Sequence, residues 1–249
     1  MYYIKNNFII YMSLRIVLCA FLNKNYIEEA KICIKSIRQN GKFNGRIDLI
    51  TDMNVDIDFD NLNVIVVNDV KNIIQCAGYR LKILNVLDWN DDDIILYLDT
   101  DIVILKPLKI FDIFDNLCDK VCVYGYSNKT QGGYSFAGFI TNDKNILKQK
   151  AFCSGIMLFK PTKFIQKVFN ETWDFYIDHI KSGKRINKYW EQPFLCLKLI
   201  QYNLYDISLN KFVHEEKSKT KMSDEVIFNH FCELRGDNRK ILMKKYITT

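Results

Sequence analysis

Short apolar runs alternate with amphipathic segments along the first hundred residues. The runs are continuous and rich in Ile, Leu and Val, which is typical of strands buried on both faces; they lie at 15–21, 46–51, 63–69 and 93–99. Between the first two, residues 25–40 carry apolar side chains at helical spacing and end in Asn40-Gly41, a pair suited to a helix C-cap. A second helix is expected at 79–89. Strands that alternate with helices predict βαβ units, and therefore an α/β fold with a mostly parallel sheet.

The second half of the chain is predicted to continue this pattern. Strands are expected at 120–127 and 152–161, and an amphipathic helix at 162–180. A further helix is expected beyond Pro193, because proline suits a first helical turn. The segment 128–142 is polar and contains glycines, which predicts a mobile loop. Residues 214–225 are charged and are expected to form a connection between elements.

Composition narrows the class of protein. The chain has 249 residues, of which 49% are hydrophobic, so it can bury a large core, and we expect a single domain over 1–249. The net charge of +6 is spread along the chain and selects neither nucleic acid nor a membrane surface; no nucleic-acid partner is expected. Lys5 and Arg15 interrupt the apolar N-terminus, so neither a membrane span nor a signal peptide is predicted.

The eight cysteines are scattered, many of them inside apolar runs. Cysteine is among the residue types most often buried, so buried free thiols are the favoured interpretation. Cys118 and Cys122 have no partners at a spacing typical of zinc sites. Free thiols and the absence of a predicted signal peptide indicate a reducing, cytoplasmic setting.

Two carboxylates interrupt the most apolar stretch. Asp99 and Asp101 follow the run IILYL, after which the chain resumes as IVIL. In a regular strand both side chains point to one face, and the carboxyl end of such a strand is where ligands bind in α/β sheets. A hard divalent cation such as Mg²⁺ or Mn²⁺ would compensate the two charges and leave coordination positions for a diphosphate. The simpler interpretation is that Asp99 caps the following turn while Asp101 is solvated.

An Asp-x-Asp pair at a strand end also resembles the motif of haloacid-dehalogenase-type phosphatases, with Asp99 as the nucleophile. That motif usually opens the fold, whereas three strand-like segments precede it here. The expected acidic motif downstream has only a weak substitute, GDN at 236–238.

Five stretches carry a more extensive resemblance, in order, over about residues 20–240. They are FLNKNYIEEAKICIKSI, YRLKILNVLDWNDDDIILYLDTDIVILKPL, FCSGIMLFKP, WEQPFL and NHFCELRGDNRK. Together they resemble the retaining glycosyltransferases of family 8, the glycogenin and galactosyltransferase type. The chain departs from the family pattern in having Cys153 for Asn and Glu191 for Asp. Gly236 also lies six residues after His230 rather than three, and no KPW follows.

This resemblance implies a GT-A fold, the Rossmann-like fold of nucleotide-diphospho-sugar transferases, with a central, mostly parallel mixed sheet flanked by helices. Residues 12–110 would form the nucleotide-sugar-binding half and residues 111–215 the acceptor-side half. Residues 216–249 would complete a site for Mn²⁺ or Mg²⁺, whose implied ligands are Asp99, Asp101 and His230.

The resemblance also implies roles for individual residues around the donor. Gln192 and Glu191 would lie near the anomeric carbon, and Lys82 would neutralise the diphosphate together with Arg235, Arg239 or Lys240. The implied contacts to the UDP-sugar are Asn23, Tyr26, Arg80, Lys82, Asp99, Thr100, Ser154 and Gly155.

The activity implied is metal-dependent, retaining transfer of a hexose from UDP-glucose, UDP-galactose or UDP-N-acetylglucosamine to a glycan, protein or lipid acceptor. The resemblance also implies that the acceptor attacks from the side of the departing diphosphate and that the leaving phosphate itself takes the acceptor's proton. No Asp or Glu nucleophile stands out in the sequence. Two alternatives stay open: the phosphohydrolase, and a catalytically inactive module that binds sugar nucleotides. The oligomeric state is open as well, a homodimer included.

Overall fold

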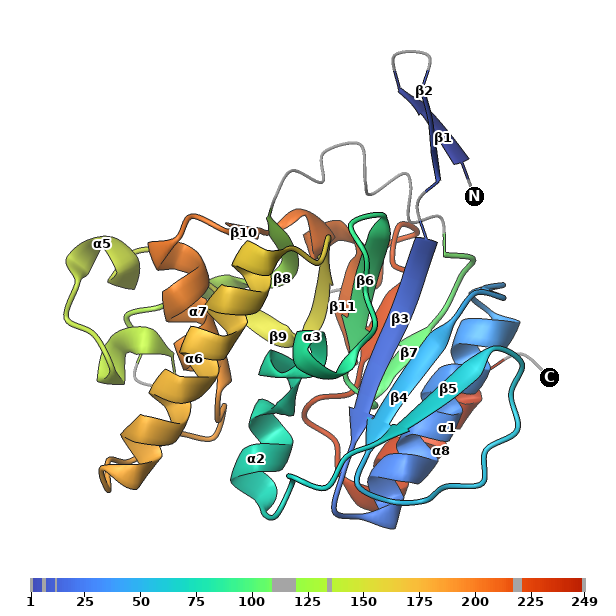
Figure 1. Cartoon of the computed structure of the whole chain (residues 1–249), viewed down its shortest axis with the longest axis horizontal. Coiled ribbons are helices and arrows are strands. Elements are labelled where there is room, and N and C mark those ends of the chain that lie inside the picture. The colour runs from blue at the N-terminus through green and yellow to red at the C-terminus, as the bar shows by residue number, and fades with distance from the viewer. Residues whose placement is uncertain are drawn as a thin grey trace.

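A seven-stranded sheet organises the part of the chain that the computed structural model describes, which is residues 2–5, 8–11, 13–108, 120–133, 136–216 and 221–247. The strand order is β10-β8-β9-β6-β3-β4-β5 (Figure 1). In chain order the strands are β3 (Ser13–Ala20), β4 (Ile47–Thr51), β5 (Leu62–Val66), β6 (Asp93–Leu98), β8 (Val121–Thr130), β9 (Lys150–Phe159) and β10 (Tyr205–Asp206).

The sheet is mixed but mostly parallel, as the sequence predicts. Strand β3 pairs in parallel with both β4 and β6, β4 pairs in parallel with β5, and β10 with β8. Strand β9 is antiparallel to its two neighbours, β6 and β8. The carboxyl ends of β3 and β6 therefore lie at one edge of the sheet, where Leu98 of β6 pairs with Ile156 of β9.

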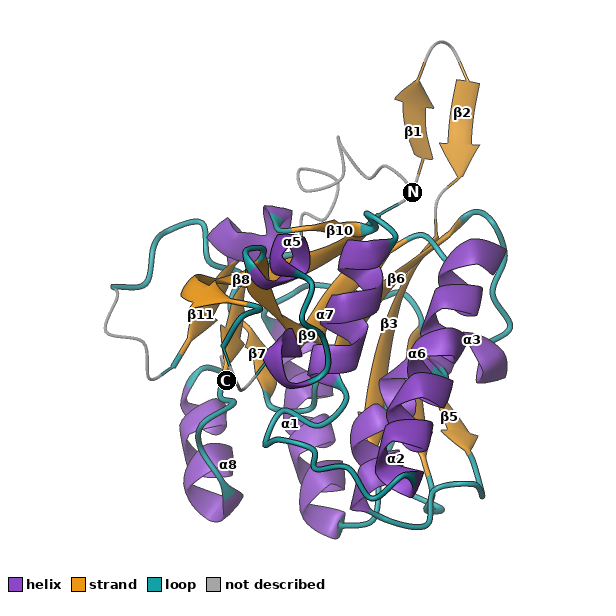
Figure 2. Ribbon diagram, turned by 90° about the vertical axis from the view of Figure 1, so that its left-hand side faces the viewer, coloured by secondary structure: helices purple, strands orange, loops and turns teal. Residues whose placement is uncertain are grey.

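The remaining strands of the described residues form two smaller sheets. Strands β11 (Val213–Glu215), β12 (Phe228–His230) and β7 (Ile102–Ile104) form a three-stranded sheet in that order. β11 is parallel to β12, and β12 is antiparallel to β7. Near the N-terminus, β1 (Tyr2–Lys5) and β2 (Phe8–Tyr11) form a hairpin that stands apart from the central sheet in both views (Figures 1 and 2).

Helices cover both faces of the central sheet (Figure 2). One face carries α1 (Lys24–Gln39), against which α8 (Gly236–Lys245) packs. The other face carries α2 (Ile73–Gly78), α3 (Ile83–Val86), α6 (Lys163–Lys181) and α7 (Gln192–Gln201). The short helix α5 spans Lys144–Leu147, and 3₁₀ turns span Tyr79–Leu81, Ala137–Phe139 and Ser208–Phe212. Of the described residues, none belong to a helix with the length and apolarity needed to cross a bilayer.

The sheet separates two hydrophobic cores, because successive side chains of a strand point to opposite faces. Ile94, Leu96 and Leu98 of β6 pack into the core on the α1 side. Ile95 and Tyr97 of the same strand pack into the core on the α6 and α7 side. This explains why the strands are continuously apolar: each of their faces is covered.

The structure differs from the sequence-based expectations in several places. The helix expected at 79–89 is broken into a 3₁₀ turn and the short α3. The connection expected at 214–225 begins inside strand β11. Within the loop expected at 128–142, β8 continues to Thr130, and residues 134–135 lie outside the described residues. The seven described cysteines are free thiols, and Cys118 lies outside the described residues.

A cluster of charges is buried at the start of β3. The guanidinium of Arg15 contacts the carboxylates of Asp48 at 3.0 Å and Asp93 at 3.2 Å, and all three residues are almost completely buried. Asp48 also accepts hydrogen bonds from Arg46 and Asn63. Burying the two carboxylates is tolerable because one cation lies between them. The cluster joins β3, β4 and β6 at the edge opposite their carboxyl ends.

We expect Arg15→Met to lower the free energy of unfolding by roughly 3 kcal/mol, because it leaves two buried carboxylates without their shared cation. The matched control is Lys31→Met, which removes an exposed cation paired with Glu28 and should change stability by less than about 1 kcal/mol. Urea denaturation followed by circular dichroism measures both. Equal effects of the two substitutions would contradict this account of the cluster.

Candidate metal and ligand site

The turn that follows β6 carries the acidic pair. Asp99 and Asp101 lie in the short connection from β6 to β7. They are therefore not part of a continuous strand in which both side chains would point to one face. Leu98 of β6 pairs with Ile156 of β9, and the Asp99 amide donates to the Gly155 carbonyl at 2.7 Å. A Cβ on Gly155 would lie 2.7 Å from Asp99 Oδ2 and 3.2 Å from His230 Cε1. Glycine at 155 therefore leaves room for the Asp99 and His230 side chains.

The small sheet brings His230 to this turn. His230 of β12 is the register partner of Ile102 in β7, so it lies next to Asp101. Its Nε2 is 3.3 Å from Asp101 Oδ1, and the two residues are only 3% and 8% exposed. One ligand atom each from Asp99, Asp101 and His230 lies within 4.8 Å of the others. The structure thus brings together the three residues that the sequence resemblance implied as metal ligands.

The buried position of Asp101 excludes the simpler sequence interpretation, in which its carboxylate is solvated. Arg239 of α8 approaches Asp101 Oδ2 at 3.3 Å and also contacts Glu29 of α1 at 3.0 Å. Asp101 Oδ1 faces His230 Nε2 at 3.3 Å and accepts no hydrogen bond within the described residues. The carboxylate is therefore compensated by Arg239 at one oxygen and by His230 at the other.

Asp99 is held by two neighbours. Tyr97 donates its hydroxyl hydrogen to Asp99 Oδ1 at 2.8 Å, and the Arg80 guanidinium contacts the same carboxylate at 3.1 Å. Arg80 lies in the 3₁₀ turn after α2, and it also lies over the Tyr97 ring. These contacts fix the position of the Asp99 carboxylate just beyond the carboxyl end of β6.

Arg80 links the acidic pair to the start of α7. Its Nε lies 3.1 Å from Glu191 Oε1, and Ser154 donates to the same glutamate oxygen at 3.1 Å. Gln192 accepts from the Ser154 amide at 3.0 Å, while its Nε2 is buried without a hydrogen-bond partner among the described residues. Trp190, with φ of +52°, turns the chain in the left-handed region immediately before Glu191. That backbone conformation is unusual for a bulky residue.

Burial and ion pairing shift the pKa values in this cluster. Burial raises the pKa of Glu191, although Arg80 opposes the change. Burial alone would lower the pKa of Arg80, but the charges of Asp99 and Glu191 outweigh it, and the pKa is raised. Burial alone would likewise lower the pKa of His230, but the Asp101 carboxylate raises it well above its usual range. Burial alone would raise the pKa of Asp101, but the charge of His230 outweighs it, and the pKa of Asp101 is lowered. The metal-free site is therefore a network of ion pairs.

Other implied site residues lie elsewhere on this edge of the sheet. Lys82 forms an ion pair with Asp69 and lies over the rings of Tyr79 and Trp173, so the structure does not bring it to the acidic pair. Asn23 caps α1 by accepting from the Asn25 amide. Tyr26 is partly buried in the first turn of α1, and Thr100 is buried between the two aspartates. Lys240 is paired with Asp237, and Arg235 is exposed at the start of α8.

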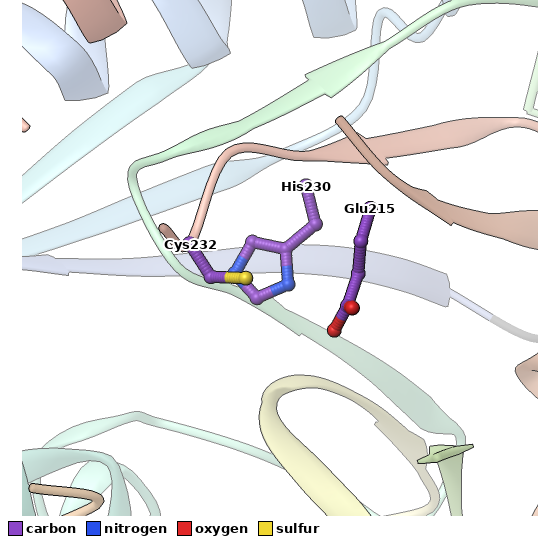
Figure 3. Close-up of side chains that lie close together, drawn as sticks. All are labelled: Glu215, His230 and Cys232. Atoms are coloured by element: carbon purple, nitrogen blue, oxygen red, sulfur yellow. The ribbon is translucent and has the colours of Figure 1, made fainter. Parts of the chain in front are cut away.

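Three residues near the site escaped the sequence analysis. Glu29 is buried beside Arg239 in the middle of a helix whose pattern gave no sign of a charged contact. Glu215 and Cys232 lie close to His230 (Figure 3). Glu215 was hidden in a charged segment that holds a three-residue strand, too short for a period to be detected.

The residues at the turn fit a hard divalent cation. Two carboxylates and an imidazole are a donor set typical of Mn²⁺, and one ligand atom from each of the three residues lies within 4.8 Å of the others. Because Gly155 has no side chain, there is space at this position for the side chains of Asp99 and His230.

Comparisons with solved structures find the same architecture. No family model and no curated protein matches the sequence. The galactosyltransferase LgtC, solved with donor and acceptor sugar analogues, matches with a TM-score of 0.65 at 15% identity, over 94% of this chain and 96% of that chain. The fold is GT-A. An active-site mutant of LgtC matches with a TM-score of 0.60 at 16% identity and the same coverage.

The GT-A fold agrees with the expectation from the sequence resemblance. In this GT-A chain, the parallel strands β3 and β6 end where Asp99, Asp101 and His230 meet. The site thus occupies the edge at which α/β sheets bind ligands. Identity this low shows the fold alone, and the chemistry has to be argued from the side chains.

We expect Gly155→Ala to weaken Mn²⁺ binding strongly while the protein still folds. The added methyl group would lie 2.7 Å from Asp99 Oδ2, closer than a Cβ can approach, and would displace the carboxylate. Gly133→Ala is the control, because its nearest neighbours would lie 3.5 Å away. Isothermal titration calorimetry with Mn²⁺ measures the difference, and unchanged affinity in Gly155→Ala would rule out this arrangement of ligands.

We also expect Mn²⁺ binding to weaken at low pH. His230 binds a metal only when neutral, and Asp101 raises the pKa of His230, so protons compete with the metal below that raised pKa. The affinity should fall about tenfold for each pH unit below it. Titrations between about pH 6 and pH 8 test this. An affinity independent of pH over that interval would show that His230 is not a ligand.

Proposed function

We propose that the protein is a metal-dependent retaining glycosyltransferase that moves a hexose from a UDP-sugar to a carbohydrate, protein or lipid acceptor. The observation that carries this proposal is the meeting of Asp99, Asp101 and His230 beside Glu191 and Gln192 at the sheet edge of a GT-A fold. A cation-binding group and a buried amide are thus adjacent, as a diphosphate and its sugar require.

The metal would be Mn²⁺ or Mg²⁺, held by Asp99, Asp101 and His230. When bound, such an ion supplies Lewis-acid stabilisation of the charge that develops on a leaving diphosphate. Arg80 is the nearest protein cation to Asp99, at 3.1 Å, and is placed to share the charge of the diphosphate. Arg239, beside Asp101, is the second such cation.

The residues at the start of α7 would bind the sugar. Gln192 has a buried Nε2 that makes no hydrogen bond among the described residues, so it can donate to a sugar oxygen. Its Oε1 already accepts from the Ser154 amide, which fixes the orientation of the amide plane. Glu191 is held by Arg80 and Ser154 and positions both. In a retaining transfer at this site, the acceptor hydroxyl would attack from the side of the leaving diphosphate, and a phosphate oxygen would take its proton.

Donor recognition would extend to the carboxyl end of β3. Asn23 and Tyr26 lie at the start of α1, immediately after that strand, and we propose that they contact the uridine. Ser154 and Gly155 of β9 would border the sugar, and Thr100 the diphosphate. Lys82 forms an ion pair with Asp69, so it would contact the diphosphate only after breaking that ion pair.

Tyr97 and Arg80 both engage the Asp99 carboxylate. These contacts would hold it equally as a metal ligand or as the nucleophile of a phosphohydrolase, because each oxygen keeps a lone pair; an assay for phosphatase activity separates the two. An inactive sugar-nucleotide module has the same ligands as the transferase, and only turnover separates the two.

We expect release of UDP from at least one of UDP-glucose, UDP-galactose and UDP-N-acetylglucosamine, in the presence of Mn²⁺, and faster release with an acceptor sugar. Asp99→Asn, Asp101→Asn and His230→Ala should each lower the rate by at least about a hundredfold, because each deletes a metal ligand. Asp91→Asn is the control, an exposed aspartate eight residues before Asp99, and should leave the rate unchanged.

A coupled assay for UDP measures turnover, and circular dichroism checks that each variant is folded. Full activity in a chelator would overturn the metal dependence. Phosphate release from simple phosphomonoesters would favour the phosphohydrolase, and UDP-sugar binding without turnover would favour the inactive module.

A further inference from the structure

His230 has two ring nitrogens, and they face different surroundings. Nε2 lies near Asp101, at 3.3 Å. Nδ1 is buried and has no hydrogen-bond partner among the described residues. An unpartnered polar atom on a side chain that is only 3% exposed is uncommon in a folded protein, and such an atom is able to bind a ligand.

Strand pairing places two further ligand groups on this side of the imidazole. Glu215 of β11 is the register partner of His230 in β12, and side chains of such partners lie beside one another. Cys232 follows His230 by two residues, in the turn that begins after the end of β12. One ligand atom each from Glu215, His230 and Cys232 lies within 4.8 Å of the others. Figure 3 shows the three side chains converging, with one ring nitrogen toward the Glu215 carboxylate.

The group lines a small pocket with a route to solvent. The pocket has a volume of about 50 Å³, and its wall includes Glu215, His230, Cys232 and Glu233. Cys232 and Glu233 are exposed, so an ion can enter from outside. Glu215 Oε1 is a second buried atom without a hydrogen-bond partner among the described residues. The pocket thus combines negative charge, unpartnered ligand atoms and access.

We propose that Glu215, His230 Nδ1 and Cys232 bind Zn²⁺, at a site separate from the Asp99 and Asp101 carboxylates. Sulfur, nitrogen and oxygen donors suit zinc, whereas Mn²⁺ and Mg²⁺ prefer oxygen, so Cys232 selects between the two kinds of ion. Three protein ligands leave a fourth tetrahedral position, which the pocket has room to fill with water. The proposal can be tested separately from the transferase function, although His230 belongs to both groups of ligands. With Zn²⁺ on Nδ1 the ring proton lies on Nε2, and both ions bind together only when the ring has lost both protons.

Cobalt(II) is the probe that tests the site. Titrating metal-free, full-length protein with Co²⁺ should give the intense near-ultraviolet band of thiolate-to-cobalt charge transfer. Cys232→Ser should abolish the band, and Cys76→Ser, a change at another partly exposed thiol, should keep it. In competition with a chromophoric chelator, Cys232→Ser should weaken Zn²⁺ binding by at least about a hundredfold, and Glu215→Gln by about tenfold. Glu233→Gln is the charge-matched control in the same pocket wall and should bind Zn²⁺ like the native protein.

Asp101→Asn separates this proposal from the proposed function. It removes a ligand of the Mn²⁺ site and leaves all three zinc ligands, so the charge-transfer band should persist in it. Loss of UDP release together with a retained band supports two separate sites. A band that persists in Cys232→Ser, or no band in the native protein, would overturn the zinc site whatever the outcome of the turnover assay. Circular dichroism of every variant excludes loss of folding as the cause of a missing band.

Discussion

Compensation of buried negative charge is the constraint on which the site depends. Asp101 is almost fully buried, and such a carboxylate persists only because His230 and Arg239 bring positive charge to it from β12 and α8. Asp99 depends in the same way on Arg80, which Glu191 also shares. Each cation comes from a different part of the chain. The site therefore exists only when the central sheet, the small sheet and the helices on both faces are assembled together.

The two metal-binding proposals follow from how the small sheet is attached. Strand β7 continues directly from the turn that carries Asp99 and Asp101, and its antiparallel partner β12 delivers His230. Strand β11 then pairs with the other edge of β12 and delivers Glu215. The carboxylates of Asp99 and Asp101 thus lie on the central-sheet side of the imidazole, and the Glu215 carboxylate and the Cys232 thiol on the other. The thiol is the donor that distinguishes the second group from the first.

The architecture was predictable because its signals are local and repeated. Continuous apolar runs mark strands covered on both faces, and the helical spacing at 25–40 corresponds to α1, Lys24–Gln39. The acidic pair was noticeable because charge interrupts an apolar run. What sequence patterns could not provide was the identity of partners far away in the chain. No residue close to Asp101 in the sequence indicates that Arg239 pairs with it. The strand that carries Glu215 has three residues, which is too few to show an alternation of polar and apolar side chains.

The single imidazole of His230 makes the two cation sites interdependent. A neutral imidazole carries a proton on one nitrogen and a lone pair on the other. An ion on one nitrogen therefore leaves the proton on the other, and a second ion binds there only by displacing that proton, which lowers its affinity. Linkage requires the effect to be reciprocal: whatever factor one ion imposes on the binding constant of the second, the second imposes on the first. Occupancy of the sulfur-containing side would then act as an allosteric input to the nucleotide side, transmitted through one aromatic ring and without any movement of the backbone.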